Sequence, residues 1–362
     1  MCKKISDKTF EEWISALQGG KSLSRSEYCV LIDSADSAQQ ELLRSVAESV
    51  TVSHFGYAVY VRGLIEISSY CRNNCLYCGL RRSNREAERY RLTQKEILDV
   101  CRQGYADGFR TFVLQGGEDT ALSDAYVADV VRAIKETCPE AAVTLSLGER
   151  SPECYQMWRE AGADRYLLRH ETRNEQHYAY LHPQEMSAAA RRQCLEHLKT
   201  LGYQVGAGMM VGSPGQTTQH LVDDLEYLDE LRPEMIGIGP FIPAANTPFA
   251  YESAGDVRKV LILLSLLRLR HPYALIPSTT ALISLYPEGR QLGLMAGANV
   301  LMPNLTPDSV RHKYAIYQNK ACTGCEEGAY VHTLNQHLHA IGRHVDMGRG
   351  DYKEKNQTSC IK

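Results

Sequence analysis

Eight short apolar runs, separated by stretches with helical periodicity, constrain the fold of this chain more than any other feature. They recur at intervals of roughly 25 to 45 residues, which is typical of strands that alternate with helices. Such strands form parallel βα units, and eight units favour a closed (β/α)8 barrel, with an open doubly wound sheet as the alternative. The runs cover residues 62–69, 111–115, 141–147, 165–171, 204–211, 235–242, 273–279 and 299–304.

Amphipathic helices are expected between the runs. One begins at Thr93, where Glu96 three residues later completes a capping box. Gly162, Gly202 and Gly297 lie just past the ends of three others, where a left-handed residue commonly ends a helix. Besides the helix at Thr93, the helical patterns, these three included, cover about 124–137, 152–161, 185–201, 217–231, 256–270 and 287–295.

Three regions follow from this pattern. Residues 1–55 are helical in pattern and are expected to pack on the barrel, which occupies 56–306. Residues 307–362 fall outside the count of units and form a C-terminal extension.

Charge and the amino terminus restrict partners and compartment. Lys plus Arg is 40 and Asp plus Glu is 43, so the net charge of −3 argues against nucleic acid or an anionic membrane as a partner. The first residues lack the apolar core of an export signal. We therefore expect a cytoplasmic protein, in which the twelve cysteines stay reduced.

Three of those cysteines are clustered directly after the first run. Cys71, Cys75 and Cys78 supply three thiolates within one loop, whereas a cubane iron–sulfur cluster has four irons. The fourth iron is then open to the amino and carboxylate groups of S-adenosylmethionine (SAM), so the motif predicts a [4Fe–4S] cluster and SAM. A zinc site made from Cys75, Cys78, Cys322 and Cys325 is the alternative, but it leaves Cys71 unexplained.

The sequence CRNNCLYCGLRRSN (71–84) resembles the cluster loop of the radical SAM superfamily, specifically its branch of [FeFe]-hydrogenase maturases (HydE) and methylornithine synthases. The resemblance covers roughly residues 55–320 and implies a (β/α)8 TIM barrel of the radical SAM type. Further similar strings are LQGGED (114–119), TLSLGE (144–149), AGADRYLLRHET (161–172), GAGMMVGSPGQT (206–217), VDDL (222–225), GIGPFIP (237–243), IPSTTA (276–281) and ANVLMPNLTP (298–307).

Cofactor-binding residues follow mostly from this resemblance. Read without it, the GGE after the second run is equally a tight turn, and an arginine on a helix is unremarkable. Arg169 and Glu171 share one face of a run and could form a mutual salt bridge. The residues expected to bind SAM are Gly116, Gly117, Glu118, Ser146, Glu171 and Arg191.

The resemblance also implies a substrate cavity in the barrel. From the pattern alone, Met302 belongs to the core and Tyr314 is a packed helix residue. Cys322 and Cys325 are a weaker signal, a candidate for an auxiliary iron–sulfur cluster. The cavity residues implied are Arg62, Ser146, Arg169, Thr279, Thr280, Ala281, Met302 and Tyr314.

The implied activity is a step in the assembly of the [FeFe]-hydrogenase H-cluster. A 5′-deoxyadenosyl radical would act on a small organometallic substrate, a cysteine-ligated iron carbonyl cyanide synthon. The implied partners are the maturases HydG and HydF and a reducing electron donor such as ferredoxin or flavodoxin.

Two other functions are weighed against this one. A methylornithine synthase, which rearranges lysine, needs carboxylates for two ammonium groups, whereas the arginines and threonines here suit anions better. A non-catalytic iron–sulfur carrier would have no use for Glu171 and Arg191.

Overall fold

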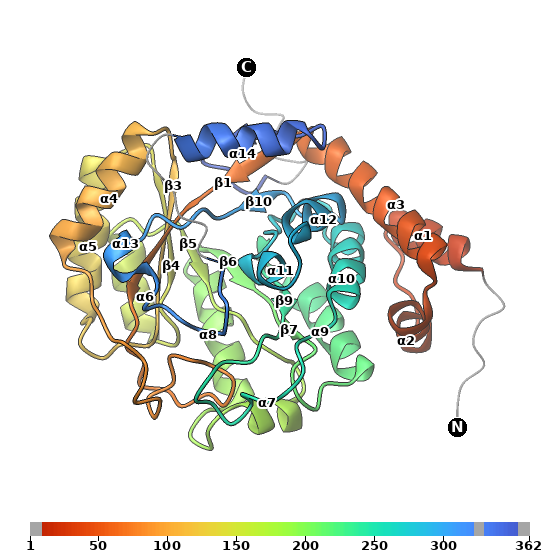
Figure 1. Cartoon of the computed structure of the whole chain (residues 1–362), viewed down its shortest axis with the longest axis horizontal. Helices are drawn as coiled ribbons and strands as arrows, with labels where there is room; N and C mark the ends of the chain where they lie inside the picture. Colours follow the sequence, from red (N-terminus) through yellow and green to blue (C-terminus); the bar gives the residue numbers. More distant parts are fainter. Residues whose placement is uncertain (1–8, 322–328, 354–362) are drawn as a thin grey trace.

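The computed structural model describes residues 9–321 and 329–353, and its centre is a parallel sheet surrounded by helices (Figure 1). Six strands in the order β2-β3-β4-β5-β6-β8 form this sheet, and every neighbouring pair is parallel. The α/β class expected from the alternating pattern is therefore confirmed. The strands are β2 (Gly63–Ser68), β3 (Thr111–Gly116), β4 (Ala142–Ser146), β5 (Arg165–Leu167), β6 (Gln204–Ala207) and β8 (Met235–Ile236).

The expected closure into a barrel is not seen in the described part of the chain, where the other strands form two smaller sheets. The run 273–279 makes only isolated bridges, from Leu275 to Met235 and from Pro277 to Val300. The smaller sheets are β10 (Val300–Leu301), β1 (Ala58–Val61) and β11 (His344–Asp346), and β7 (Met210–Val211) with β9 (Gly239–Pro240).

Glycine and proline explain why the runs on this side are interrupted. Pro277 has no N–H to donate to a neighbouring strand. Gly208 separates β6 from β7; its φ is +155°, and a Cβ there would lie 1.9 Å from the carbonyl oxygen of Gly237. The apolar pattern therefore predicted where these segments lie, but not where glycine and proline interrupt the strands.

Helices lie where the sequence predicts them around the sheet. In the capping box of α4, the N–H of Glu96 lies 3.3 Å from Oγ1 of Thr93, whose own N–H donates to the Glu96 carboxylate at 2.7 Å. Gly162, Gly202 and Gly297 all have positive φ, as expected. The helices are α4 (Gln94–Ala106), α5 (Asp124–Thr137), α6 (Pro152–Glu160), α8 (Ala188–Thr200), α9 (Thr218–Leu231), α10 (Val257–Arg270) and α12 (Gly289–Met295).

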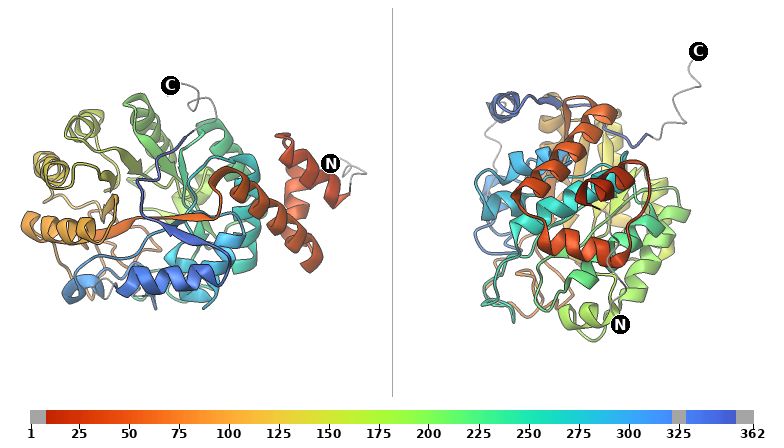
Figure 2. Two further views of the ribbon diagram at one scale, coloured as in Figure 1. Left: turned by 90° about the horizontal axis from the view of Figure 1, so that it is seen from above. Right: turned by 90° about the vertical axis from the view of Figure 1, so that its right-hand side faces the viewer.

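Shorter helices and the N-terminal helices complete the fold. The sequence did not resolve α7 (Glu175–Leu181), α11 (Thr280–Leu285), α13 (Asp308–Arg311) and α14 (Ala329–His339). The expected N-terminal helices are α1 (Phe10–Gln18), α2 (Arg25–Ser34) and α3 (Ser37–Phe55), which project from one flank of the molecule (Figure 2). They attach through contacts of α3 with α10 and of α2 with α9. Among the described helices, none is long and apolar enough to cross a membrane.

The segment after α14 closes the end of the sheet at which the strands begin. Arg165, fully buried at the start of β5, donates to the carbonyl oxygen of Arg349 at 2.7 Å and to Asp351 at 2.6 Å. Burial alone would raise the pKa of Asp351, but hydrogen bonds from Arg349 and Arg165 lower it to about 2. Residues 349 and 351 are therefore held against the amino-terminal end of β5, called the floor here, opposite the end at which the chemistry is expected.

Candidate active site

The loop of residues 69–84, called the cluster loop here, follows β2 at the carboxyl ends of the strands. Its backbone is tied to two different segments. The N–H of Arg72 donates to the carbonyl of Glu118 at 2.9 Å, and the N–H of Gly79 donates to that of Ile316 at 2.9 Å. The loop is therefore held by the end of β3 on one side and by the C-terminal extension on the other.

Two arginines beyond the loop fix its shape. The Arg89 guanidinium donates to the carbonyl oxygens of Leu80 at 3.0 Å and Arg81 at 2.9 Å. Arg91 pairs with Asp119 through two hydrogen bonds, at 2.5 and 3.0 Å. Burial would raise the pKa of Asp119, but hydrogen bonds from Arg91, Ser68 and the N–H of Ala121 together outweigh burial and lower that pKa. Asp119 is therefore an anion that clamps the loop at neutral pH.

The three thiols of the loop are half-buried and influence one another. Burial, and then the charge of Cys71, raises the pKa of Cys78 to about 12. Burial raises the pKa of Cys75 well above its usual value, with further contributions from Cys78 and Cys71. Thiols in such surroundings ionise when a metal takes the place of the proton.

This donor set fits a cluster with three protein ligands. Among the described residues, no three His, Cys, Asp or Glu side chains are arranged to hold a single metal ion. Three thiols on one loop are the donor set expected for an iron–sulfur cluster in which one iron is left to another ligand. Cys322 and Cys325, the candidate auxiliary ligands, lie outside the described residues.

Glycines allow β3 and β4 to approach the cluster loop. A Cβ on Gly117 would lie 2.2 Å from the carbonyl oxygen of Tyr70 and 2.7 Å from the Cβ of Cys71. Gly148 has φ +77°, and a Cβ there would lie 2.0 Å from Cγ of Glu118. These contacts leave no space for a side chain, so both positions require glycine.

Arg191 from α8 and two carboxylates meet beside the loop. Its Nη1 lies 3.1 Å from Oε1 of Glu149 and 3.7 Å from Oε1 of Glu118. Its Nε and Nη1 are buried without a well-aligned hydrogen bond in the described part of the chain. Burial raises the pKa of Glu149, and the charge of Arg191 reduces this shift. The sequence did not single out Glu149, although it ends one of the similar strings.

A cleft of about 300 Å³ opens at this position. It brings residues of the cluster loop together with the two carboxylates and the start of α8. Its lining consists of Arg72, Asn73, Arg82, Glu118, Glu149, Glu185, Met186, Ser187 and Ala190.

Arg169 and Glu171 form the mutual ion pair that the sequence left open. Nη2 of Arg169 donates to Oε2 of Glu171 at 2.7 Å. Nε of Arg169 is buried without an acceptor among the described residues. Glu171 has φ +65°, an uncommon conformation for a residue other than glycine. Such strain persists where the surroundings fix the backbone, often at functional sites.

A small cavity of about 20 Å³ lies inside the sheet, toward the floor. Nη1 of Arg62 contacts Sδ of Met235 at 3.1 Å, while its Nε and the Oγ1 of Thr144 have no hydrogen-bond partner in the described ranges. Burial and the nearby Arg165 hold the pKa of Arg62 well below its usual value. The lining residues are Arg62, Val113, Thr144, Leu167, Met235, Gly237, Leu275, Pro277, Val300 and Met302.

Thr279, Thr280 and Ala281 lie at the start of α11. Thr279 occupies the N-cap position, but its side chain makes no capping bond, and its buried Oγ1 finds no partner within the described chain. Thr280 and Ala281 are half-buried in the first turn. Ser146, also half-buried, ends β4 in register with Gln115 of β3.

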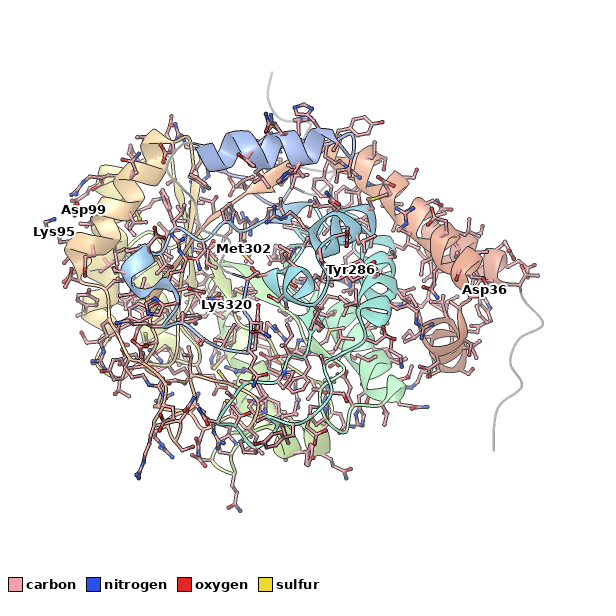
Figure 3. The ribbon with its side chains drawn as sticks, in the orientation of Figure 1. Asp36, Lys95, Asp99, Tyr286, Met302 and Lys320 are labelled. Atoms are coloured by element: carbon pink, nitrogen blue, oxygen red, sulfur yellow. The ribbon has the colours of Figure 1, made fainter. Side chains whose placement is uncertain are left out.

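A cluster that the sequence did not predict lies over the interior. Nζ of Lys320 bonds to the Glu66 carboxylate and, at 3.2 Å, to the carbonyl oxygen of Tyr314. Asn304 donates to the same carboxylate at 3.0 Å, and Gln115 donates to the Tyr314 hydroxyl at 3.4 Å. Figure 3 shows Lys320 and Met302 over the middle of the molecule. Glu66 could have been noticed as the one acidic residue of its run, whereas Lys320 follows the barrel region and carries no such signal.

Comparisons with known proteins identify the family of this chain. Residues 65–228 match the family model described as the radical SAM superfamily. The [FeFe] hydrogenase maturase subunit HydE of Thermotoga maritima is 44% identical over 323 residues, which is 89% of this chain and 92% of that protein. The 3-methylornithine synthase of Methanosarcina acetivorans is 27% identical over 88% of this chain and 89% of its own.

Solved structures show the same fold. Methylornithine synthase (PylB) superposes with a TM-score of 0.81 and 26% identity, over 92% of this chain and 97% of that one. The hydrogenase maturase HydG superposes with a TM-score of 0.78 at 20% identity, over 94% of this chain and 77% of that one. Because of the long match at 44% identity, we conclude that this chain belongs to the radical SAM superfamily and, within it, to the family of the [FeFe]-hydrogenase maturase HydE.

Proposed function

We propose that this protein is a HydE-type maturase that acts on a cysteine-ligated iron carbonyl cyanide synthon during assembly of the H-cluster. The family implies a [4Fe–4S] cluster and SAM. When bound, they supply a 5′-deoxyadenosyl radical through reductive cleavage of SAM. The observation that carries the choice of substrate is a set of buried donors for which the described residues offer no acceptor.

The residues around the cluster loop divide into two roles. Cys71, Cys75 and Cys78 would hold the cluster through their thiolates, leaving one iron to SAM. Glu118, Glu171 and Arg191 would hold the charged methionine end, with Gly116, Gly117 and Ser146 beside it. The ion pair of Arg191 with Glu149 supports this assignment, because it presents a buried guanidinium beside the loop.

Buried donors around the interior support an acceptor-rich substrate. Four buried donors lack a partner among the described residues: Nε of Arg62, Oγ1 of Thr144, Nε of Arg169 and Oγ1 of Thr279. A buried donor without an acceptor costs about 1–3 kcal/mol. Carboxylate, cyanide and carbonyl groups of the synthon would all accept hydrogen bonds from these donors, whereas lysine offers a single carboxylate and two ammonium groups that only donate. This difference favours the HydE-type substrate over that of a lysine mutase.

The wider assignment follows from the same proposal. We infer that the strands belong to a (β/α)8 barrel of residues 56–306, which the parallel bridges at Leu64 and Leu275 support. The preceding helices (1–55) and the extension (307–362) would flank it. HydG would supply the substrate, HydF would receive the product and a ferredoxin or flavodoxin would donate electrons, all in the cytoplasm. An auxiliary cluster on Cys322 and Cys325 is part of the proposal, as are contacts of Thr280, Ala281, Met302 and Tyr314 with substrate.

Hydrogenase activation tests the proposal directly. The protein is purified anaerobically, reconstituted with iron and sulfide, and added to a maturation mixture that lacks only HydE. We expect hydrogen evolution that depends on SAM and is abolished by Cys71→Ala. Cys29→Ala on α2, far from the loop in sequence, is the control and should retain activity.

Two results would contradict the proposal in different ways. SAM cleavage without hydrogenase activation would leave the radical SAM assignment intact and reject the substrate; lysine would then be tested, because methylornithine synthase shares the fold. Glu171→Ala should abolish SAM binding, whereas a wild type that holds the cluster but neither binds nor cleaves SAM would favour a non-catalytic iron–sulfur carrier.

A further inference from the structure

Residues 312–321, called the cover segment here, lie across the open end of the sheet. The carbonyl of Ile316 accepts the N–H of Gly79 in the cluster loop. At its far end, the N–H of Ala321 donates to Oγ of Ser284 in α11 at 2.9 Å. The cover segment therefore joins the loop of the thiols to the helix that begins at Thr279 and Thr280.

Lys320 belongs to the cover segment, and its side chain points toward the interior of the molecule, where it pairs with Glu66. Its side chain is 13% exposed, and its partner Glu66 on β2 is 1% exposed. Burial raises the pKa of Glu66, and the charge of Lys320 opposes this shift. Removing two charges from water is costly, and a packed apolar pair often serves stability as well. A role in stability alone therefore does not account for this pair.

The hydrogen bonds of the pair leave one N–H of Lys320 without an acceptor among the described residues. An ammonium has three N–H groups, of which Glu66 and the carbonyl of Tyr314 accept two. Nζ lies 4.8 Å from the centre of the Tyr314 ring. The hydroxyl of that ring accepts from Gln115, so its own proton remains to be donated. Donors of Lys320 and Tyr314 thus lie close together.

We propose that Lys320 is a specificity-determining residue that binds the carboxylate of the substrate through its ammonium, with Glu66 fixing its position. This inference rests on the proposed function, in which the substrate carries a cysteine ligand with a carboxylate. Lys320 would contact the substrate from outside the strands, and the cover segment would then contribute directly to recognition.

Binding of two matched probes tests the proposal. L-cysteine carries the carboxylate, whereas cysteamine is the same molecule without it. Isothermal titration of the reconstituted protein should show tighter binding of L-cysteine in the wild type. Lys320→Met should weaken L-cysteine binding roughly 10- to 100-fold and leave cysteamine unchanged. Lys320→Arg should retain most of the preference.

A lysine of the same segment provides the matched control. Lys313 pairs with the exposed Glu88 at 3.5 Å, so Lys313→Met should bind both probes like the wild type. Reductive SAM cleavage and the melting temperature report whether the variants fold. If Lys320→Met does not fold, Lys320→Gln, which keeps a neutral donor, replaces it and should show a smaller loss.

The proposal is overturned by any of three results. They are no preference for L-cysteine in the wild type, no change in Lys320→Met, or an equal loss of both probes, which would indicate a structural cover only. Hydrogenase activation by the wild type is measured in parallel. Its failure rejects the proposed function, whereas activation together with any of the three results rejects only the role of Lys320.

Discussion

The two sides of the strand layer differ in regularity. From β2 to β4 the strands are five or six residues long and pair without a break except at the last position of β2. From run 235–242 to run 299–304 the strands are two residues long and are joined by isolated bridges. The regular side leads into the cluster loop, and the interrupted side carries Thr279 and Met302.

This difference suggests a division of physical requirements. A loop that must hold three thiols needs fixed strand ends, which an unbroken ladder of hydrogen bonds provides. A cavity forms where the strands do not fill the interior evenly. Glycine and proline interrupt a strand and so leave such space, whereas an unbroken strand would not. Three experiments can break or sharpen this comparison.

The largest effect is expected from replacing a glycine by alanine on the regular side, compared with the same change on the interrupted side. Gly117→Ala places a Cβ 2.2 Å from a carbonyl oxygen, so we expect a loss of about 1–3 kcal/mol in the free energy of unfolding and poor retention of iron. Gly237→Ala is the matched control, because its Cβ meets nothing within 4 Å. Melting temperature and iron content measure both. Equal losses would show that the two sides are equally constrained.

A smaller effect is expected at the floor beneath the regular side. Asp351 has its pKa lowered to about 2, against about 3.9 in an unfolded chain. The pair therefore contributes stability above about pH 4, on the order of 2 kcal/mol, and this contribution is lost as the pH falls through 2. Asp351→Asn should lose this amount at pH 7 and approach the wild type below pH 3.

Unfolding midpoints of the wild type and variant across this range provide the measurement. Asp99→Asn is the control, because Asp99 pairs with Lys95 on the outer face of α4 (Figure 3). Its effect should be small at every pH. A difference between wild type and Asp351→Asn that persists unchanged at pH 2 would refute the role of the carboxylate charge.

The smallest change in stability is expected on the interrupted side. Thr279→Val removes a hydroxyl without a partner in the described part of the chain, so the cost should stay below about 0.5 kcal/mol. Hydrogenase activation should nevertheless fall. Thr51→Val removes a hydroxyl that donates to Ala47 at 3.0 Å and should cost about 1 kcal/mol without affecting activation. The reverse pattern would assign Thr279 a structural role.

The sequence predicted the elements better than their continuity. Helical periodicity and the capping box at Thr93 located the outer helices, because these signals act within a few residues. The small sheet of β1, β10 and β11 was not predicted, since its strands come from distant parts of the chain. The positive φ of Glu171 also depends on surroundings that no local pattern records.

The candidate site divides in the same way. The cysteine spacing identified the cluster loop from eight residues, whereas Glu149 and Lys320 acquire their partners only through the fold. Arg169 and Glu171 were found together by their shared face, and their ion pair was one of the two outcomes considered. Residues close together in the sequence could therefore be predicted as parts of the site, whereas ion pairs between distant residues could not.

The pairing of β1 with β11 has a consequence for biosynthesis. Residues 58–60 find their partners only at 344–346, nearly 300 residues later. A growing polypeptide therefore cannot complete this sheet, or bring Asp351 to Arg165, until residues 344–351 have been synthesised. Contacts between such distant residues form late and slowly. The cluster loop is synthesised long before β11 and Asp351, so it exists for much of translation without the contacts that complete the floor.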